Sequence, residues 1–211
     1  MPDPNLSKPR KLPRQSRSVA MVDAILEASA RVLLERGYAG MSTNVVAQQA
    51  GVSVGSLYQY FPNKESLLVA LHSRHAEQMA RSIEAILNAP GNGGLRGEIV
   101  RLVRAAMAAH EVEPQLHRLL ENERPFFEGN NSGKGVEADI HRHIQRLLAD
   151  HPDDVRHPDL AVAAWMTMRM TESLVHTAIL HPPHDLVLSQ IEPAIVDAIH
   201  AFLTYDSRHR S

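Results

Sequence analysis

Residues 41–60, MSTNVVAQQAGVSVGSLYQY, constrain the fold of this chain more than any other segment. Ala47 and Ala50 recur at helical spacing. Gly51 follows them, and glycine readily adopts the left-handed backbone conformation that ends a helix. Ser53 is a preferred N-cap residue, which predicts a second helix directly after the turn. We therefore expect two short helices joined by a tight turn.

The first of these helices is expected to begin at Thr43, whose hydroxyl can accept an unpaired backbone N–H. On the second helix, a rotation of about 100° per residue separates an inner from an outer set of side chains. The expected inner set is Val54, Leu57, Tyr58 and Phe61, and the expected outer set is Gly55, Ser56, Gln59 and Tyr60. A helix this short is not stable alone, so its inner set must pack on neighbouring helices. Its outer set then fits the DNA major groove, which is about 12 Å wide.

The residues that follow favour nucleic-acid binding over an ordinary helical hairpin with a solvated polar face. Asn63 is placed to cap another helix, with Lys64 in its first turn. A positive charge at that position opposes the helix dipole, and a nearby phosphate would remove the conflict. A lysine that is simply solvated is the alternative at Lys64.

Ala24 to Leu71, AILEASARVLLERGYAGMSTNVVAQQAGVSVGSLYQYFPNKESLLVAL, resembles the DNA-binding domain of TetR-type (tetracycline-repressor-like) regulators. The matching motifs include a first helix that ends in Gly37-Tyr38, the turn Ala50-Gly51-Val52-Ser53, the pair Tyr60-Phe61 and the run Lys64-Glu65-Ser66-Leu67-Leu68. The resemblance covers about a quarter of the chain. The remainder is similar to that family in length and helical character but not in motif.

The resemblance implies DNA contacts position by position. The residues expected at the phosphate backbone are Thr43, Ser56, Tyr58, Tyr60 and Lys64. The residues expected near base edges are Asn44, Val54, Gly55 and Gln59. Among these, Gln59 is the strongest candidate because its amide can pair bidentately with adenine. Val54 and Gly55 have no side-chain hydrogen bonds to offer, so part of the specificity is expected from DNA shape.

Charge is divided unevenly along the chain, whose formal net charge is −2. Residues 1–81 hold ten Lys/Arg against six Asp/Glu, a net of +4, whereas residues 82–211 hold twelve against eighteen, a net of −6. This asymmetry is typical of a basic DNA-binding domain on an acidic body. The first 18 residues are basic and contain four prolines, which predicts a flexible arm. Either this arm is an inert tail, or Arg14 and Arg17 contact phosphates or the minor groove.

Helical periodicity without a convincing strand pattern predicts an all-α fold of nine helices. The first helix is expected at about 19–36 and a long fourth helix at about 64–87, ended by the Pro- and Gly-rich loop at 90–94. Five more are expected at about 95–110, 114–123, 136–150, 158–180 and 185–204, the last kinked or restarted at Pro193. The expected organisation is an arm (1–18), a helix-turn-helix DNA-binding domain (19–65) and a helical body (66–211).

The resemblance also implies that the body binds a small-molecule effector in a cavity among its middle helices and forms a homodimer through its last two helices. The candidate effector-site residues are Met79, Ile83, Met107, Phe126, Phe127, Trp165 and Met168. The candidate dimer-interface residues are Leu174, Ala178, Leu188, Ile191, Ile195, Ile199 and Phe202. The alternative for both sets is that they fill the core of the monomer.

Other kinds of chemistry find little support in the sequence. No cysteine is present, which excludes disulfides and thiolate zinc sites. The thirteen histidines match no zinc-enzyme motif, so we interpret them as surface or capping residues and predict no metal and no cofactor. The most apolar helix, at 159–180, contains Arg169, Glu172 and His176 and is a poor membrane span. With no apolar signal segment either, a cytoplasmic protein without membrane contact is expected.

The sequence therefore predicts a ligand-responsive transcriptional regulator, most simply a repressor, that binds a palindromic double-stranded DNA operator as a homodimer. Two alternatives remain open at this point. The chain could be an enzyme that uses the cavity of the body, although no catalytic constellation stands out. It could also be an architectural protein that binds DNA without sequence preference.

Overall fold

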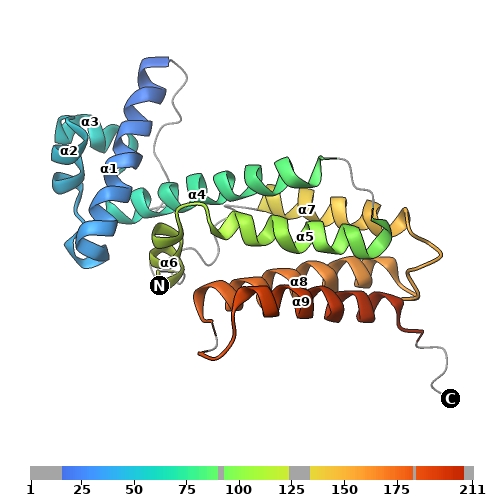
Figure 1. The fold of residues 1–211 in the computed structure, drawn as a ribbon. Helices are drawn as coiled ribbons and strands as arrows, with labels where there is room; N and C mark the ends of the chain where they lie inside the picture. Colours follow the sequence, from blue (N-terminus) through green and yellow to red (C-terminus); the bar gives the residue numbers. More distant parts are fainter. Residues whose placement is uncertain (1–15, 90–92, 124–133, 183, 207–211) are drawn as a thin grey trace. The chain divides into compact units, whose positions relative to one another are not determined.

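The computed structural model describes residues 16–89, 93–123, 134–182 and 184–206, which form nine α-helices and no strand (Figure 1). The all-α prediction is confirmed. The helices are α1 (Ser16–Gly40), α2 (Thr43–Ala50), α3 (Val54–Tyr60), α4 (Lys64–Leu87), α5 (Gly94–His110), α6 (Pro114–Asn122), α7 (Lys134–Ala149), α8 (Leu160–Leu180) and α9 (Leu188–Thr204). None of the described helices is long and apolar enough to cross a membrane.

The chain divides into two compact units, which differ from the division expected at residue 65. The first unit comprises Met1–Ala76 and Glu113–Ser132, and the second comprises Glu77–Val112 and Gly133–Ser211. Helix α6, which we expected in the body, belongs to the first unit. The reason is that Leu116 and Leu120 of α6 are buried in the same apolar core as α1.

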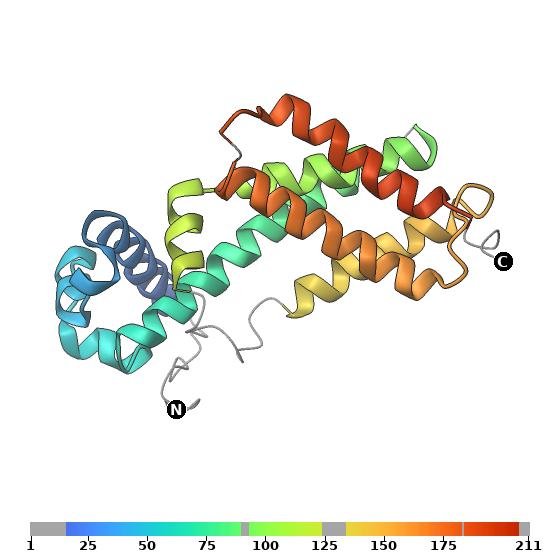
Figure 2. The same ribbon diagram turned by 90° about the horizontal axis from the view of Figure 1, so that it is seen from below.

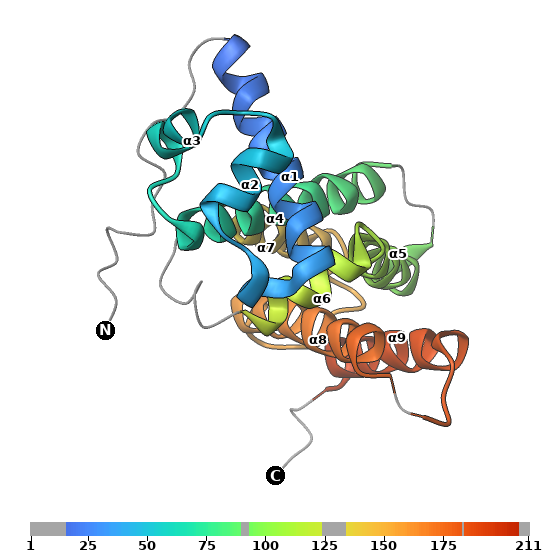
Figure 3. The same ribbon diagram turned by 90° about the vertical axis from the view of Figure 1, so that its left-hand side faces the viewer.

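The first unit is built around α1. Helix α2 lies against both α1 and α3, and α6 lies against α1 (Figure 3). The core contains fully buried side chains from α1, α3 and α4, among them Ile25, Leu33, Leu57 and Leu67. Gly37, with φ 63° and ψ 178°, interrupts α1 after Arg36, as the Gly37-Tyr38 motif predicts.

The second unit is a bundle in which α8 packs on α5, α7 and α9, and α5 also packs on α9 (Figure 2). Its core includes Ile99 of α5, Leu148 of α7, Ala163 of α8 and Ile199 of α9. Helix α9 continues through Pro193, so of the expected kink or restart the restart does not occur. Pro193 is exposed and lies in the second turn of the helix, so only one backbone hydrogen bond near the helix start is lost.

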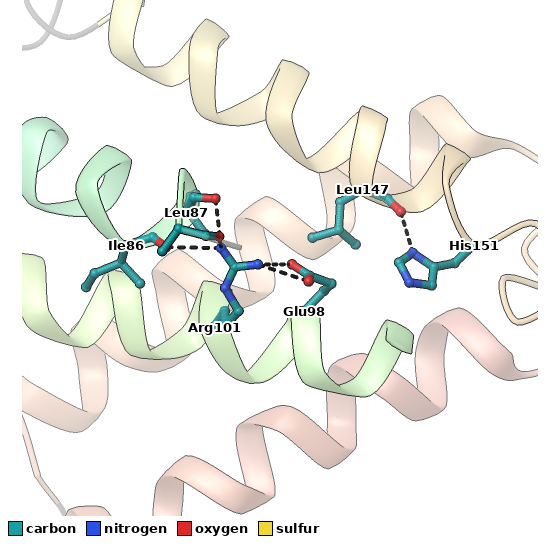
Figure 4. Close-up of polar contacts among 7 residues, drawn as sticks. Ile86, Leu87, Glu98, Arg101, Leu147 and His151 are labelled. Atoms are coloured by element: carbon teal, nitrogen blue, oxygen red, sulfur yellow. Dashed lines mark hydrogen bonds and ion pairs between the residues drawn. The ribbon is translucent and has the colours of Figure 1, made fainter. Parts of the chain in front are cut away.

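Within the second unit, Arg101 of α5 closes the carboxyl end of α4 (Figure 4). Its Nη2 donates to the carbonyl oxygens of Ile86 (3.1 Å) and Leu87 (2.8 Å), and also to that of Ala89. Its Nη1 lies 2.7 Å from a carboxylate oxygen of Glu98. A single guanidinium therefore satisfies carbonyls that have no partner inside the helix and at the same time neutralises a largely buried acid.

Candidate nucleic-acid interface

The start of α2 is fixed by Ser42. Its Oγ accepts a hydrogen bond from the backbone N–H of Val45 at 3.3 Å, so the N-cap is Ser42 and not Thr43 as expected. Both residue types are good N-caps, and the sequence around them does not distinguish the two positions. Thr43 is instead the first residue of α2, which leaves its hydroxyl available for another contact.

The turn between α2 and α3 is formed as the sequence predicts. Gly51 adopts the left-handed conformation with φ 68°, and Val52 N–H donates to the carbonyl of Ala47 at 3.0 Å. Ser53 caps α3, because its Oγ accepts from the N–H of Ser56 at 3.0 Å. The hydroxyls of Ser53 and Ser56 lie 2.8 Å apart. The Ser56 hydroxyl therefore already has a partner within the cap.

The inner and outer sides of α3 differ from the expected assignment. Leu57, Phe61 and also Tyr60, which is 7% exposed, belong to the core of the first unit. Val54 and Tyr58, placed on the inner side by the sequence, are 39% and 41% exposed. The seven-residue helix contains only about two turns, so its periodicity fixes the buried direction poorly. The direction follows from Leu57, whose neighbours three and four residues later are Tyr60 and Phe61.

The exposed side of the two helices is held together by a hydrogen bond between the hydroxyls of Thr43 and Tyr58, which lie 3.1 Å apart. Asn44, Gly55 and Gln59 are exposed as well. This surface therefore combines amide and hydroxyl groups with an aromatic side chain. These are groups that form hydrogen bonds to phosphates and base edges.

Lys64 stands at the start of α4 beside Tyr38, which the sequence pattern did not predict as part of the site. Asn63 caps the helix, with its Oδ1 accepting from Ser66 N–H at 2.8 Å. The Lys64 ammonium lies 4.1 Å from the centre of the Tyr38 ring, a cation–π contact. The Tyr38 hydroxyl donates to Glu65 Oε1 at 3.2 Å. Tyr38 therefore contacts Lys64 through its ring and Glu65 through its hydroxyl, and so holds both side chains in place.

Burial and acidic neighbours raise the pKa of Tyr38 to about 12. Burial makes the largest contribution, followed by the charge of Glu65, the hydrogen bond to Glu65 and the charge of Glu123. The hydroxyl therefore stays protonated and remains a donor to Glu65. No local sequence pattern predicts the contacts among Tyr38, Lys64 and Glu65, because Tyr38 lies at the end of α1 and the other two lie at the start of α4.

Helices α2 and α3 contain no charged side chain, so electrostatic attraction to DNA must come from their surroundings. Lys64 is one source. The expected arm would add Arg14 and Arg17, but Arg14 and the side chain of Arg17 lie outside the described residues, so this expectation stays a prediction.

The expected effector-site residues are distributed over different environments in the second unit. Ile83 and Met107 are partly buried against its core, Met168 is buried in it, and Met79 is half-buried. Trp165 is 52% exposed and points away from the core, because Ala164 and Met168 occupy the buried side of α8. Trp165 is therefore a surface residue of this unit. Phe126 and Phe127 lie outside the described residues.

The expected dimer-interface residues also separate into two groups. Leu174 and Leu188 are exposed, and Ile191 and Phe202 are partly buried. Ala178, Ile195 and Ile199 are buried. Ile195 and Ile199 belong to the second unit's own core, so these two side chains are not available to a second copy of the chain. The periodicity of α9 therefore marks mainly the inner side of the helix.

Three histidines depart from the expectation of surface or capping positions. His75 and His117 of the first unit and His110 of the second are buried. Within the second unit, the ring of His110 packs edge-on against that of His176, with centroids 5.7 Å apart, and its Nδ1 lies 2.8 Å from the carbonyl oxygen of Ala106. Hydrogen bonds to ring nitrogens allow histidine to be buried, which composition alone does not reveal.

Two family models match the chain and together span both units. Residues 25–71 match the model described as "Bacterial regulatory proteins, tetR family", and residues 95–203 match "Tetracyclin repressor-like, C-terminal domain". The chain belongs to the tetR family. It is a DNA-binding transcriptional regulator, and the alternative of an enzyme is set aside because the family consists of regulators.

Individual relatives agree with the family assignment. The transcriptional repressor KstR of Rhodococcus jostii is 29% identical over 160 residues, which cover 69% of this chain and 72% of that protein. The fatty acid metabolism regulator protein of Bacillus subtilis is 40% identical over 60 residues, only 28% of this chain and 29% of the relative. The structure of the fatty acid degradation regulator FadR from Bacillus halodurans superimposes with a TM-score of 0.60 at 20% identity, covering 94% of this chain and all of that one. At that identity the likeness shows the fold alone.

Proposed function

We propose that this tetR-family protein is a repressor that binds a palindromic DNA operator as a homodimer and is released by a small-molecule effector. The observation that supports it best is the exposed surface of α2 and α3. Asn44, Tyr58 and Gln59 are exposed there, while the opposite side of α3 is fixed in the core by Leu57. The similarity to KstR, a protein named as a repressor, supports the direction of the regulation.

Each exposed residue has a proposed role in this surface. Gln59 contacts a base edge, and its two-point amide pairing with adenine gives sequence preference. Asn44, Val54 and Gly55 approach the groove beside it. Tyr58, linked to the Thr43 hydroxyl, contacts the phosphate backbone. Tyr60 is buried and the Ser56 hydroxyl is hydrogen-bonded to Ser53. We therefore assign these two residues to positioning α3 rather than to contacting DNA.

The proposed regulation is a shift between two conformations of a dimer. Two DNA-binding units separated by about 34–36 Å, or a multiple of that spacing, would contact the two halves of a palindrome. An effector bound in the second unit releases DNA only if it binds the non-binding conformation more tightly. We place this activity in the cytoplasm, where operator DNA is accessible.

Selection of bound sequences from a random DNA pool tests the proposal. The expected result is a palindromic consensus. Recovery of random sequence would instead indicate the architectural alternative, and recovery of a single half-site would contradict dimeric binding.

The selected operator then tests the role of Gln59. We expect Gln59→Ala to weaken binding to the selected operator by about 1–3 kcal/mol while leaving binding to scrambled DNA nearly unchanged. Gln115→Ala is the matched control, because Gln115 is an exposed glutamine on α6 of the same unit. Equal losses on operator and scrambled DNA would remove Gln59 from the base-contacting residues.

Lys64→Ala provides a contrast in the same assay. Removing a phosphate contact should weaken binding to both DNAs and reduce the salt dependence by about one contact. Arg118→Ala, an exposed cation on α6, controls for net charge. If both variants change the salt dependence equally, Lys64 acts through net charge and not through a specific phosphate.

A further inference from the structure

Two buried histidines, one on α4 and one on α6, meet in the first unit. His75 of α4 and His117 of α6 are 2% and 6% exposed. His75 Nε2 lies 3.1 Å from His117 Nδ1, and the ring centroids are 5.2 Å apart with planes tilted by 37°. The rings therefore meet through their nitrogens. Two imidazole nitrogens that face each other share either one proton or one metal ion.

A carboxylate lies at the other nitrogen of His75. Glu113 Oε2 is 3.9 Å from His75 Nδ1. A negative charge at this position favours the tautomer with its proton on Nδ1, which leaves the Nε2 lone pair directed at His117. In metal sites, the second ring N–H of a histidine ligand commonly donates to a carboxylate, and the 3.9 Å contact of Glu113 would have to shorten to form that hydrogen bond. The Glu113 side chain is about half exposed, so it links the buried pair to solvent.

The backbone of Glu113 provides a second, independent observation. With φ 49° and ψ 59° it is the one non-glycine residue with positive φ among the residues that the structure describes. Glu113 occupies the N-cap position of α6, yet its side chain makes no capping hydrogen bond there. A non-glycine residue rarely adopts this conformation and keeps it only where its surroundings fix it. In this conformation the Glu113 carboxylate lies beside His75 and does not cap α6.

We propose that His75 Nε2 and His117 Nδ1 bind a transition-metal ion of the zinc class, with Glu113 orienting His75. At metal–nitrogen distances of about 2.0–2.1 Å, two ligands of a tetrahedral ion lie about 3.3–3.4 Å apart. The observed 3.1 Å therefore needs to open by only a few tenths of an ångström. Imidazole ligands favour Zn²⁺, Cu²⁺ and Ni²⁺ over Mg²⁺ and Ca²⁺, and water completes the coordination.

Such an ion would join α4 to α6 inside the unit that contains the helix-turn-helix. Because the ion binds only the folded arrangement of the two helices, it stabilises that unit. An effect of the ion on operator affinity rests on the proposed function, but the binding of the ion does not.

Zinc titration of the full chain in competition with a chromophoric chelator, without DNA, tests the site. The variants are His75→Gln, His117→Gln and Glu113→Gln, with His72→Gln as the matched control from the same helix, one turn earlier. The wild type and the control should bind one equivalent of Zn²⁺ more than His75→Gln and His117→Gln. Glu113→Gln should keep the site with an affinity about 10- to 100-fold weaker. Zn²⁺ should also raise the Tm of the wild type and the control but not that of His75→Gln.

Equal stoichiometry in the wild type and both histidine variants would overturn the proposal, as would an absence of zinc binding by the wild type. Circular dichroism establishes whether the variants are folded. If the histidine variants unfold, the zinc affinity of Glu113→Gln tests the proposal instead. A zinc affinity equal to that of the wild type would overturn it. Operator selection performed in the presence of a chelator tests the proposed DNA-binding function without bound metal. A negative zinc titration therefore leaves the operator result valid, and a failed operator selection leaves the zinc-binding result valid.

Discussion

At the scale of single residues, burial determines how His143 responds to pH. The pKa of His143 is lowered from its ordinary value of 6.5, first by burial and then by the charges of Arg146 and Arg101, while Glu98 acts in the opposite direction. The unfolded chain therefore binds this proton more readily than the folded chain. The contribution of the neutral His143 ring to the free energy of unfolding is fully present above about pH 6.5 and is lost as the pH falls below that value.

We therefore expect His143→Gln to be less sensitive to mild acid than the wild type. Thermal unfolding between pH 7.5 and 5.5 should show a smaller decrease in Tm for this variant, because it has no ring to protonate. His184→Gln is the control, because His184 is exposed. A Tm decrease in His143→Gln as large as in the wild type would contradict the assignment.

Residues whose role depends on their nearest neighbours in the chain were predictable. Gly51, Ser53 and Asn63 adopt the turn and capping roles that their local chemistry favours. The contact between Lys64 and Tyr38 was not predictable, because it joins the end of α1 to the start of α4. The same holds for the pair of His75 and His117, which are 42 residues apart.

At the scale of an element, the end of α4 depends on a side chain from α5. Arg101 and Glu98 are 21% and 16% exposed, so removing the guanidinium leaves a largely buried carboxylate unpaired and removes a hydrogen-bond donor from the carbonyl groups at the end of α4. We expect Arg101→Met to lower the free energy of unfolding by about 2–4 kcal/mol, measured by urea denaturation.

Arg104→Met is the matched control for this prediction. Arg104 pairs with Glu192 at 2.7 Å, but its side chain is 65% exposed, so its loss should cost less than about 1 kcal/mol. A double variant, Arg101→Met with Glu98→Leu, should recover part of the stability because it also removes the unpaired acid. Similar decreases in the free energy of unfolding for Arg101→Met and Arg104→Met would show that the Arg101 contacts at the end of α4 add little to stability.

The existence of the helices followed from the sequence more reliably than their orientation. Long helices such as α4 and α8 have enough turns for periodicity to identify them. The short α3 does not, and its buried side is set by the position of Leu57 in the core. Helix α9 shows a second limit: the stripe through Ile195 and Ile199 identifies an apolar side, but only the fold determines that the unit itself covers it.

At the scale of the whole molecule, the division of charge was evident from composition, whereas the division into compact units was not. The position of α6 depends on Leu116 and Leu120, whose partners lie on helices far away in the sequence. An apolar pattern predicts that a side chain will be buried but does not identify the surface that buries it. The same ambiguity separates core from interface on α8 and α9.

Exposure identifies which residues of the proposed dimer interface can be tested. Leu174 of α8 and Leu188 of α9 leave apolar side chains on the surface of the second unit, where a second copy can cover them. Placing an ionised carboxylate in such an interface is unfavourable, so we expect Leu174→Glu and Leu188→Glu each to weaken dimerisation at least tenfold, about 1.4 kcal/mol. Sedimentation velocity over a range of protein concentrations measures this change.

Leu34→Glu is the matched control, because Leu34 is a similarly exposed leucine on α1 of the first unit. It should leave the dimer intact, since it adds the same charge to a helix of the other unit, outside α8 and α9. Both interface variants should also lose operator affinity, because a single DNA-binding unit contacts only half of a palindrome. A wild type that sediments as a monomer at micromolar concentration, or dimers unaffected by the two interface variants, would assign the exposed leucines another role and remove the physical basis for palindromic binding through α8 and α9.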